Sequence, residues 1–188
     1  DYSLEFSAAA PDFGAAVTNP YGLRSVNLLS VPHLVDIDAD GDLDAMFGTY
    51  AAGTVVQLNT GSASAPTFGA ATINPYNLAY TSYDSSPSFV DIDADGDLDA
   101  LIGNHTSNIR VQLNIGTARE PDFDEVSINP YGLVKAEGRV SDPNFVDIDG
   151  DGDLDALIIS NGANYTGNFQ VQLNTGSASA PAFGEVVL

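Results

Sequence analysis

Three short stretches of the chain are dense in aspartate, a residue that can ligate metal ions or exchange protons. Residues 35–45 read VDIDADGDLDA, residues 90–100 repeat these letters, and residues 146–156 read VDIDGDGDLDA. Each stretch places five aspartates within nine residues. Carboxylates at this density repel one another, so the pattern predicts a bound cation in each stretch.

The spacing of these aspartates suits calcium, which takes about six to eight oxygen ligands, often at alternate positions of a tight loop. Read as D-x-D-x-D-G-D-x-D, the loop has a glycine at position 6, where the chain must turn sharply. We expect side-chain ligands at positions 1, 3, 5 and 9 and a backbone carbonyl ligand at position 7. The three predicted calcium sites consist of Asp36, Asp38, Asp40, Asp42 and Asp44; of Asp91, Asp93, Asp95, Asp97 and Asp99; and of Asp147, Asp149, Asp151, Asp153 and Asp155.

These loops differ from the EF-hand, which needs a glutamate at position 12 and a helix after it. Position 12 is Phe47, Ile102 or Ile158, each within an apolar, strand-like segment. The alternative interpretation is an acidic turn that water alone solvates. Three copies at matched positions, each with the turn glycine, favour the cation site.

The aspartate stretches belong to a longer internal repeat of about 55 residues. VQLN at 56–59 returns at 111–114 and 171–174, and the third repeat carries about four extra residues around 161–168, which we expect to form a loop. The second repeat contains strand-like segments at 87–92, 98–103, 109–114 and 122–128, separated by turn residues. The pattern predicts an all-β fold of β-propeller-type blades, namely three four-stranded antiparallel repeats at 32–86, 87–142 and 143–188.

Residues 11–18 align with the last strand of a repeat, so the segment 1–31 is expected to be the end of a further blade and to supply a surplus strand. Three blades cannot enclose a propeller axis, and exposed strand edges tend to pair with other chains. We therefore expect either flanking blades of a longer chain or self-association with other copies. The surplus strand could pair with a neighbouring chain.

The motif PxFVDID before the loop and APxFG later in the repeat make the chain resemble the FG-GAP (VCBS-type) repeats. These are the calcium-binding blades of integrin-α-like propellers, which are common in secreted bacterial proteins. The resemblance covers residues 11–188 and implies that each loop lies between the first and second strands of a blade, with its aspartates on calcium. The chain departs from the family in its three blades, where about seven are usual. It also has Asp124 where other repeats have glycine, so the turn there is expected to differ.

The charge balance restricts the partners, because 26 acidic residues face only 5 basic ones and the net charge is −21. Three divalent cations would bring it to −15, which still argues against binding nucleic acid or an anionic membrane surface. The chain has no cysteine, and none of its apolar runs approaches the ~20 residues of a membrane helix. Its start at Asp1 is expected to reflect a removed signal peptide or an excised piece.

Few other residues suggest chemistry. No sequence motif pairs His33 with His105, and both are expected to have ordinary structural or surface roles. Tyr21, Tyr76 and Tyr131 recur in NPY turns, where they either pack between blades or form an aromatic rim that contacts a ligand. Asn104 and Asn164 lie in N-glycosylation sequons, a pattern that often occurs by chance.

The sequence contains no Ser/His/Asp arrangement, nucleophile elbow or phosphate-binding loop. It therefore predicts a non-enzymatic, extracellular or cell-surface calcium-binding module for adhesion or for binding a protein or carbohydrate. The alternative is a structural subunit that self-assembles through its blades into a ring or an extracellular filament. An enzyme is disfavoured, because the carboxylates suited to acid–base catalysis are committed to the cation loops.

Overall fold

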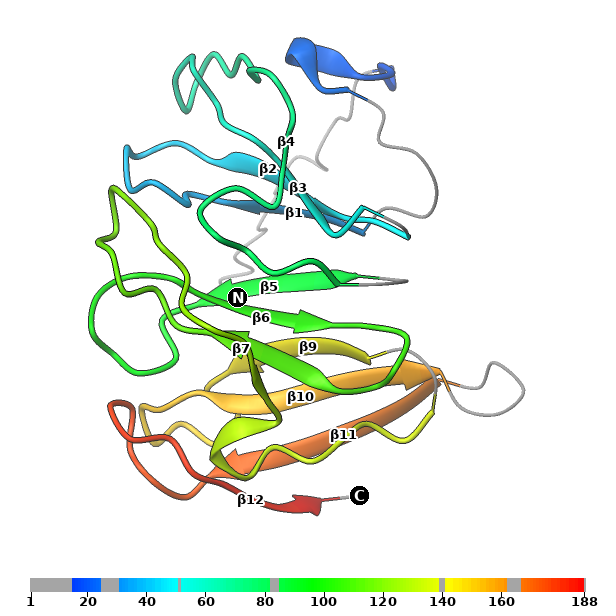
Figure 1. Cartoon of the computed structure of the whole chain (residues 1–188), viewed down its shortest axis with the longest axis vertical. Coiled ribbons are helices and arrows are strands. Elements are labelled where there is room, and N and C mark those ends of the chain that lie inside the picture. Colours follow the sequence, from blue (N-terminus) through cyan, green and yellow to red (C-terminus); the bar gives the residue numbers. More distant parts are fainter. Residues whose placement is uncertain are drawn as a thin grey trace, which may run out of the picture.

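The structure is a computed structural model that describes residues 15–24, 31–50, 52–81, 85–138, 141–161 and 167–187. Its strands form three four-stranded antiparallel sheets, stacked in sequence order (Figure 1). Blade 1 contains β1 (Val31–Val35), β2 (Asp44–Gly48), β3 (Thr54–Gln57) and β4 (Thr72–Ile73). Blade 2 contains β5 (Ser86–Val90), β6 (Asp99–Gly103), β7 (Ile109–Gln112) and β8 (Ser127–Ile128). Blade 3 contains β9 (Ser141–Val146), β10 (Asp155–Asn161), β11 (Gly167–Asn174) and β12 (Phe183–Val187).

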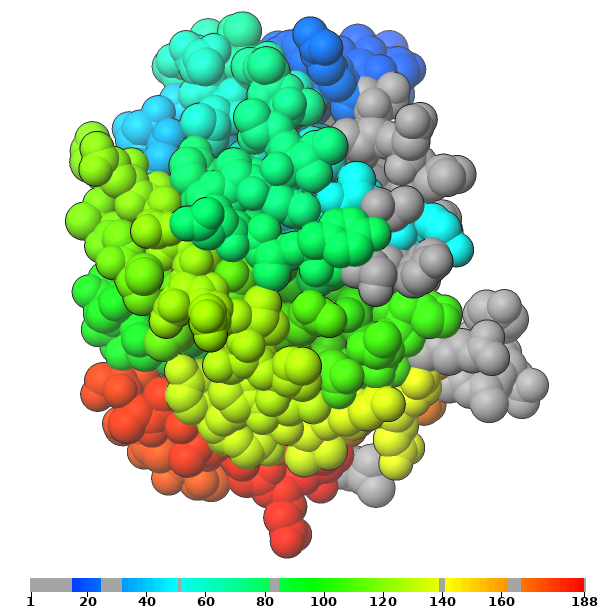
Figure 2. All heavy atoms as spheres, in the orientation of Figure 1, coloured from blue at the N-terminus to red at the C-terminus, as the bar shows by residue number. Residues whose placement is uncertain are grey.

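The predicted all-β fold with three four-stranded repeats is confirmed, and each sheet follows the chain from its first strand to its fourth. Figure 2 shows the repeats as successive bands along the molecule. The described strands form an open stack rather than a closed propeller. The two short 3₁₀ helices, η1 (Pro20–Gly22) and η2 (Pro130–Gly132), lie in NPY turns, and the described residues include no helix able to cross a bilayer.

The predicted surplus strand at 11–18 lies mostly outside the described residues, which begin at residue 15. Residues 15–18 are exposed and belong to none of the strands. The insertion at 161–168 was expected to be a loop, but part of it lengthens a hairpin. Ser160 pairs with Asn168 and Asn161 with Gly167, so β10 and β11 extend past the ends of their counterparts in the other blades. Residues 162–166 between them are not described.

The fourth strands of blades 1 and 2 are shorter than the segments that align with them in sequence. β4 and β8 have two residues each, and the chain before them meets β3 and β7 only through the isolated bridges Asn59↔Phe68 and Asn114↔Phe123.

Two apolar clusters fill the junctions between the blades. The cluster between blades 1 and 2 contains Ile37, Met46, Val56, Leu78, Ala100, Ile102 and Phe123. The cluster between blades 2 and 3 contains Ile92, Leu101, Ile109, Val111, Leu133, Ala136, Phe145, Ala156, Ile158 and Phe183. Every residue of β6 is buried, because the middle blade is covered on both faces. Burial on both faces explains why β6 is continuously apolar after Asp99, since a strand covered on two sides needs no alternation.

Glycine permits the closest approach between blades. A Cβ on Gly48, the last residue of β2, would overlap the carbonyl oxygen of Ser85 at the start of the next blade, and Gly103 of β6 is placed in the same way. In β10 the equivalent residue is Ile159, which pairs with Phe169 of β11. Phe169 is 65% exposed. The outer face of blade 3 therefore does not reproduce the surface that blades 1 and 2 offer to the blade after them.

A buried glutamine at the end of each third strand ties the blade to the NPY turn of the preceding repeat. The side chain of Gln112 accepts a hydrogen bond from the backbone N–H of Ala79 (2.8 Å) and donates to the carbonyls of Asn77 (3.2 Å) and Asp124 (2.6 Å). Equivalent bonds join Gln57 to Arg24, Gly22 and Gly69, and Gln172 to Val134, Gly132 and Gly184. The glutamine thus fixes each turn on the following blade.

The expected difference at Asp124 is not found. Its N–H donates to the carbonyl of Leu113, just as the N–H of Gly69 donates to the carbonyl of Leu58. A Cβ on Gly69 would come no closer than 3.5 Å to any other group. The position therefore has room for a side chain, and aspartate leaves the turn unchanged.

We predict that Gln112→Met lowers the free energy of unfolding by about 2–3 kcal/mol, because at nearly constant volume it removes all three hydrogen bonds that the buried Gln112 side chain makes to the backbone. Gln170→Met is the matched control. Gln170 is also buried, and within the described structure it accepts a single hydrogen bond, from Glu137, so we expect about 1 kcal/mol. Urea denaturation of both variants measures the difference, and equal losses would contradict the bracing role of Gln112.

Candidate metal centres

The three aspartate loops connect β1 to β2, β5 to β6 and β9 to β10, and they lie along one edge of the stack, at the left of Figure 1. Each loop leaves the end of a first strand and enters a second strand whose first residue is the position-9 aspartate. The strand–loop–strand hairpin expected for these sites is therefore present in all three blades.

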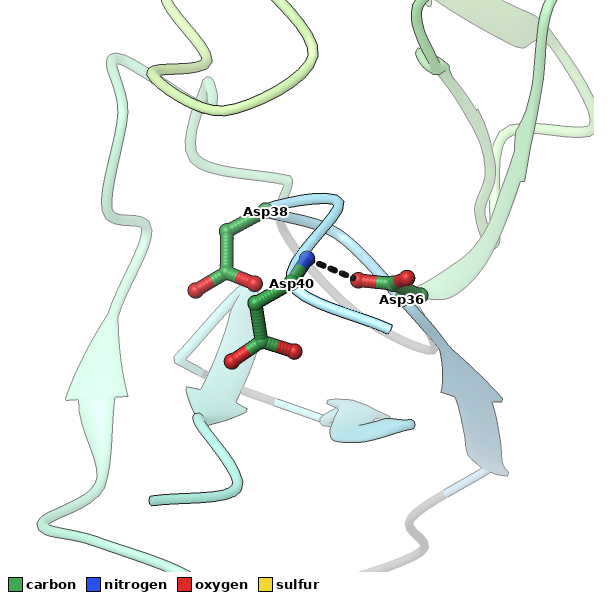
Figure 3. Close-up of side chains that lie close together, drawn as sticks. All are labelled: Asp36, Asp38 and Asp40. Atoms are coloured by element: carbon green, nitrogen blue, oxygen red, sulfur yellow. Dashed lines mark hydrogen bonds between the residues drawn. The ribbon is translucent and has the colours of Figure 1, made fainter. Parts of the chain in front are cut away.

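The first aspartate of the loop organises its backbone. In blade 1 the carboxylate of Asp36 accepts hydrogen bonds from the backbone N–H groups of Asp40 (3.1 Å) and Gly41 (3.0 Å), and Figure 3 shows the bond to Asp40. Asp91 makes the same two bonds in blade 2. The turn requires φ of +101° at Gly41, a conformation that favours glycine, and this explains the glycine at position 6.

The folded loops bring several of the predicted ligands together. Oxygen atoms of positions 1 and 3 lie within 4.8 Å of each other in all three blades, and within that distance of a third carboxylate. The third member is position 5 in blade 1 and position 9 in blades 2 and 3. The three groups are Asp36, Asp38 and Asp40 (Figure 3); Asp91, Asp93 and Asp99; and Asp147, Asp149 and Asp155.

Several carboxylate oxygens in these loops are buried without a hydrogen-bond donor. Among the described residues, the Oδ1 atoms of Asp38, Asp42, Asp93, Asp97 and Asp153 have no partner. A buried, unpaired carboxylate oxygen is costly, and a cation would remove the cost. The set contains only hard oxygen donors, which suits calcium.

Position 7 has a feature beyond its expected role. The loop pattern assigned it a backbone carbonyl ligand, yet Asp42, Asp97 and Asp153 each also bury a side-chain oxygen that lacks a donor. The spacing of the aspartates along the sequence does not predict that the position-7 side chain is buried in this way.

The last aspartate of the loop is a buried brace. Asp44 accepts hydrogen bonds from the backbone N–H of Ile37 (3.1 Å), inside the loop, and of Asn59 (2.7 Å), after the third strand. Asp99 and Asp155 make the equivalent pairs of bonds, with Ile92 and Asn114 and with Ile148 and Asn174. Position 9 therefore links the cation loop to the far side of its own sheet.

The asparagine of the VQLN motif continues this link, and its role was missed in the sequence. The side-chain carbonyl of Asn59 accepts hydrogen bonds from the N–H groups of Gly61 (3.1 Å) and Thr67 (2.8 Å), which closes the turn before β4. Asn114 and Asn174 do the same in their blades. The repetition of VQLN was the available signal, but repetition alone did not assign the asparagine a function.

Burial dominates the electrostatics of the loops. It raises the pKa of Asp44 to about 6 and that of Asp99 to about 7, although two backbone N–H bonds oppose the shift in each case. Burial, and next the adjacent aspartate charges, also raise the pKa of Asp38 and Asp93. In loops 1 and 2, burial therefore opposes the ionisation of these carboxyl groups and raises their pKa values.

The remaining singled-out residues lie apart from these groups. His33 is half-buried, and its Nε2 has no partner among the described residues. His105 is exposed. Asn104 is fully buried, so its amide is not accessible to a glycan in the folded chain. Asn164 lies outside the described residues.

Comparison with protein-family models identifies part of this chain. Residues 91–158 match the model of the FG-GAP-like repeat. The matched span begins at the first aspartate of the blade 2 loop and includes the whole blade 3 loop. The chain therefore contains an FG-GAP-like repeat, as its resemblance to that family indicated. A search of curated proteins gave no significant match.

We predict that the metal-free protein loses stability as the pH rises from about 4 to about 7. Asp44 and Asp99 have higher pKa values folded than unfolded, so the folded state holds their protons more tightly and loses this advantage as they ionise. Thermal melts in chelator-treated buffer measure the trend. Asp99→Asn should flatten it, and a metal-free melting temperature that rises over this range would contradict the assignment.

Proposed function

We propose that the chain is a non-enzymatic, extracellular calcium-binding repeat module that serves adhesion or the binding of a protein or carbohydrate ligand. The observation that carries this proposal is the set of buried carboxylate oxygens without donors, which recurs at positions 3 and 7 of the loops. The simplest function for a loop of mutually repelling carboxylates that occurs in three copies is to bind one cation in each copy. The FG-GAP-like repeat at 91–158 supports the same conclusion.

Calcium is favoured over other metals by ligand chemistry. The loops offer carboxylate and carbonyl oxygens, whereas zinc favours nitrogen and sulfur donors. Magnesium demands a compact octahedral shell and retains several waters, while calcium accepts the larger and more irregular set that five aspartates provide. FG-GAP repeats are typically extracellular, where calcium is plentiful enough for sites of about 0.1–1 mM affinity.

A second candidate is a subunit that self-assembles into a ring or filament. Exposed apolar side chains on both ends of the stack favour it, since Leu34 on blade 1 is 61% exposed and Phe169 on blade 3 is 65% exposed. Ile159 argues against assembly by a simple copy of the internal junction, which needs glycine at that position. Light scattering separates the candidates: a particle of one 19.5-kDa chain supports the module, and a multiple of it supports the subunit.

We predict that calcium at about 1 mM stabilises the protein by up to about 4 kcal/mol, the sum reached when each of three sites has the tighter affinity of about 0.1 mM and contributes RT ln(11), about 1.4 kcal/mol. For a chain of this size the melting temperature should then rise by up to about 8–16 °C. Melts in calcium and in EDTA measure the effect, with magnesium at the same concentration as the control. Coincident melts in calcium and EDTA would rule out the cation sites.

We predict that Asp38→Ala weakens calcium binding more than Asp42→Ala. The first change removes a carboxylate from the three-residue group, while the second leaves the expected carbonyl ligand in place. The same order is expected for Asp93 against Asp97 and for Asp149 against Asp153. Isothermal titration of the paired variants decides it. Equal losses would mean that the inward carboxylate of position 7 is itself a principal ligand.

A further inference from the structure

The tyrosine of each NPY turn stands between two blades. The carbonyl of Tyr76 accepts a hydrogen bond from the N–H of Phe123 in blade 2 (2.9 Å), and the glutamine brace holds the same turn on that blade. The half-buried ring packs against the junction cluster that contains Ile37, a residue of the blade 1 loop. The backbone of Tyr76 therefore belongs to blade 2, while its ring reaches the loop of blade 1.

The charges around the phenol are those that this position places beside it. The pKa of Tyr76 is raised first by burial and then by the charges of Asp38 and Asp44, two of the predicted ligands of that loop. Tyr131 repeats the arrangement one blade further on. Burial raises its pKa, followed by the charges of Asp93 and Asp99, and its turn is held on blade 3 through Gly132 and Gln172.

The backbone of these tyrosines is held in a conformation that residues with side chains rarely adopt. Their φ angles are +57° at Tyr76 and +59° at Tyr131, and Tyr21 has +58° in the first NPY turn. Such a conformation persists when the surrounding contacts fix it. The docked turn therefore aims the ring in one direction.

The first turn and the third loop provide an internal comparison. Tyr21 lies in the same turn on blade 1, and its carbonyl accepts a hydrogen bond from the N–H of Phe68 (2.8 Å). However, no aspartate loop of the described structure lies beside Tyr21, and its side chain is 62% exposed. The loop of blade 3 in turn has no NPY tyrosine among the described residues. Its Ile148 is 46% exposed, whereas the equivalent Ile37 and Ile92 are 2% and 3% exposed.

We propose that Tyr76 and Tyr131 are positioning residues that close the cation loop of one blade and thereby couple cation binding to the docking of the next blade. The inference rests on the proposed calcium sites and divides them into two classes. Loops 1 and 2 are closed junction sites, and loop 3 is an open site that binds more weakly. The ring excludes water from the loop, which strengthens the attraction between cation and carboxylate, and it holds the loop in its bound form before the cation arrives.

Calcium titration tests the coupling. Tyr76→Ala should lower the affinity of one site by about fivefold or more, the usual lower range of coupling between linked sites. Tyr76→Phe should retain the affinity, because the ring acts by packing. Tyr21→Ala is the matched control and should leave all affinities unchanged. In the Asp38→Asn background, adding Tyr76→Ala should have no further effect on the remaining sites, which assigns the loss to loop 1.

Terbium luminescence tests the geometry independently, because a terbium ion in a calcium site emits when an adjacent tyrosine is excited. The wild type should emit strongly, and the Tyr76→Phe/Tyr131→Phe variant should lose most of the emission while still binding three ions. Adding Tyr21→Phe should change the emission little.

In the calcium titration, Tyr76→Leu replaces Tyr76→Ala if the alanine variant does not fold.

Two results would overturn the inference: equal calcium affinities in the Tyr76→Ala and Tyr21→Ala variants, or undiminished emission without Tyr76 and Tyr131. A wild type that binds neither calcium nor terbium would instead refute the proposed function first. Binding of three ions with unaltered affinity in every tyrosine variant would leave the calcium sites standing and refute only the coupling.

Discussion

The repulsion among clustered carboxylates is the constraint on which the architecture depends. Each loop concentrates five negative charges at the entrance to a central strand, and the chain has only five basic residues to oppose 26 acidic ones. The fold uses the backbone instead. N–H groups in the loop converge on the first aspartate, and N–H groups from two parts of the sheet converge on the last. The carboxylate oxygens that remain without donors define where a cation fits.

The same loops reach into the junctions between blades. Ile37 and Ile92 lie inside the aspartate loops and are members of the two apolar clusters. The glutamine brace then fixes the turn that follows one blade on the next. Loop, turn and junction are thus joined by direct packing contacts and hydrogen bonds.

Local patterns in the sequence were sufficient to predict much of this fold. The three repeats, the order of four strands and the placement of each aspartate loop follow from features within a few residues of one another, such as the turn glycine and the apolar segment after it. The structure also agrees with the NPY tyrosines packing between blades, since Tyr76 and Tyr131 lie in the two junctions.

Features that depend on contacts between residues far apart in the sequence could not be predicted from local patterns. The bonds of Gln112 to Asn77 and Ala79 join residues 33–35 positions apart, and nothing local in VQLN indicates them. The inward side chain of Asp42 depends on the loop's three-dimensional path. Asp124 was misjudged because a glycine can be present without its special φ, and the insertion at 161–168 was misjudged because loop-like composition also occurs at the end of a hairpin.

The fifth residue of each second strand has a consequence for how such an array can lengthen. Gly48 and Gly103 leave room for the following sheet, whereas the third repeat has Ile159 at the equivalent position. A gene duplication that copies residues 32–86 yields a unit that accepts a successor as it stands. A copy of residues 143–188 placed in the interior would require replacement of Ile159 before another unit could follow. The side chain at position 159 thus bars the docking geometry of the two internal junctions, and the gene must change that codon before this unit can precede another in the same way.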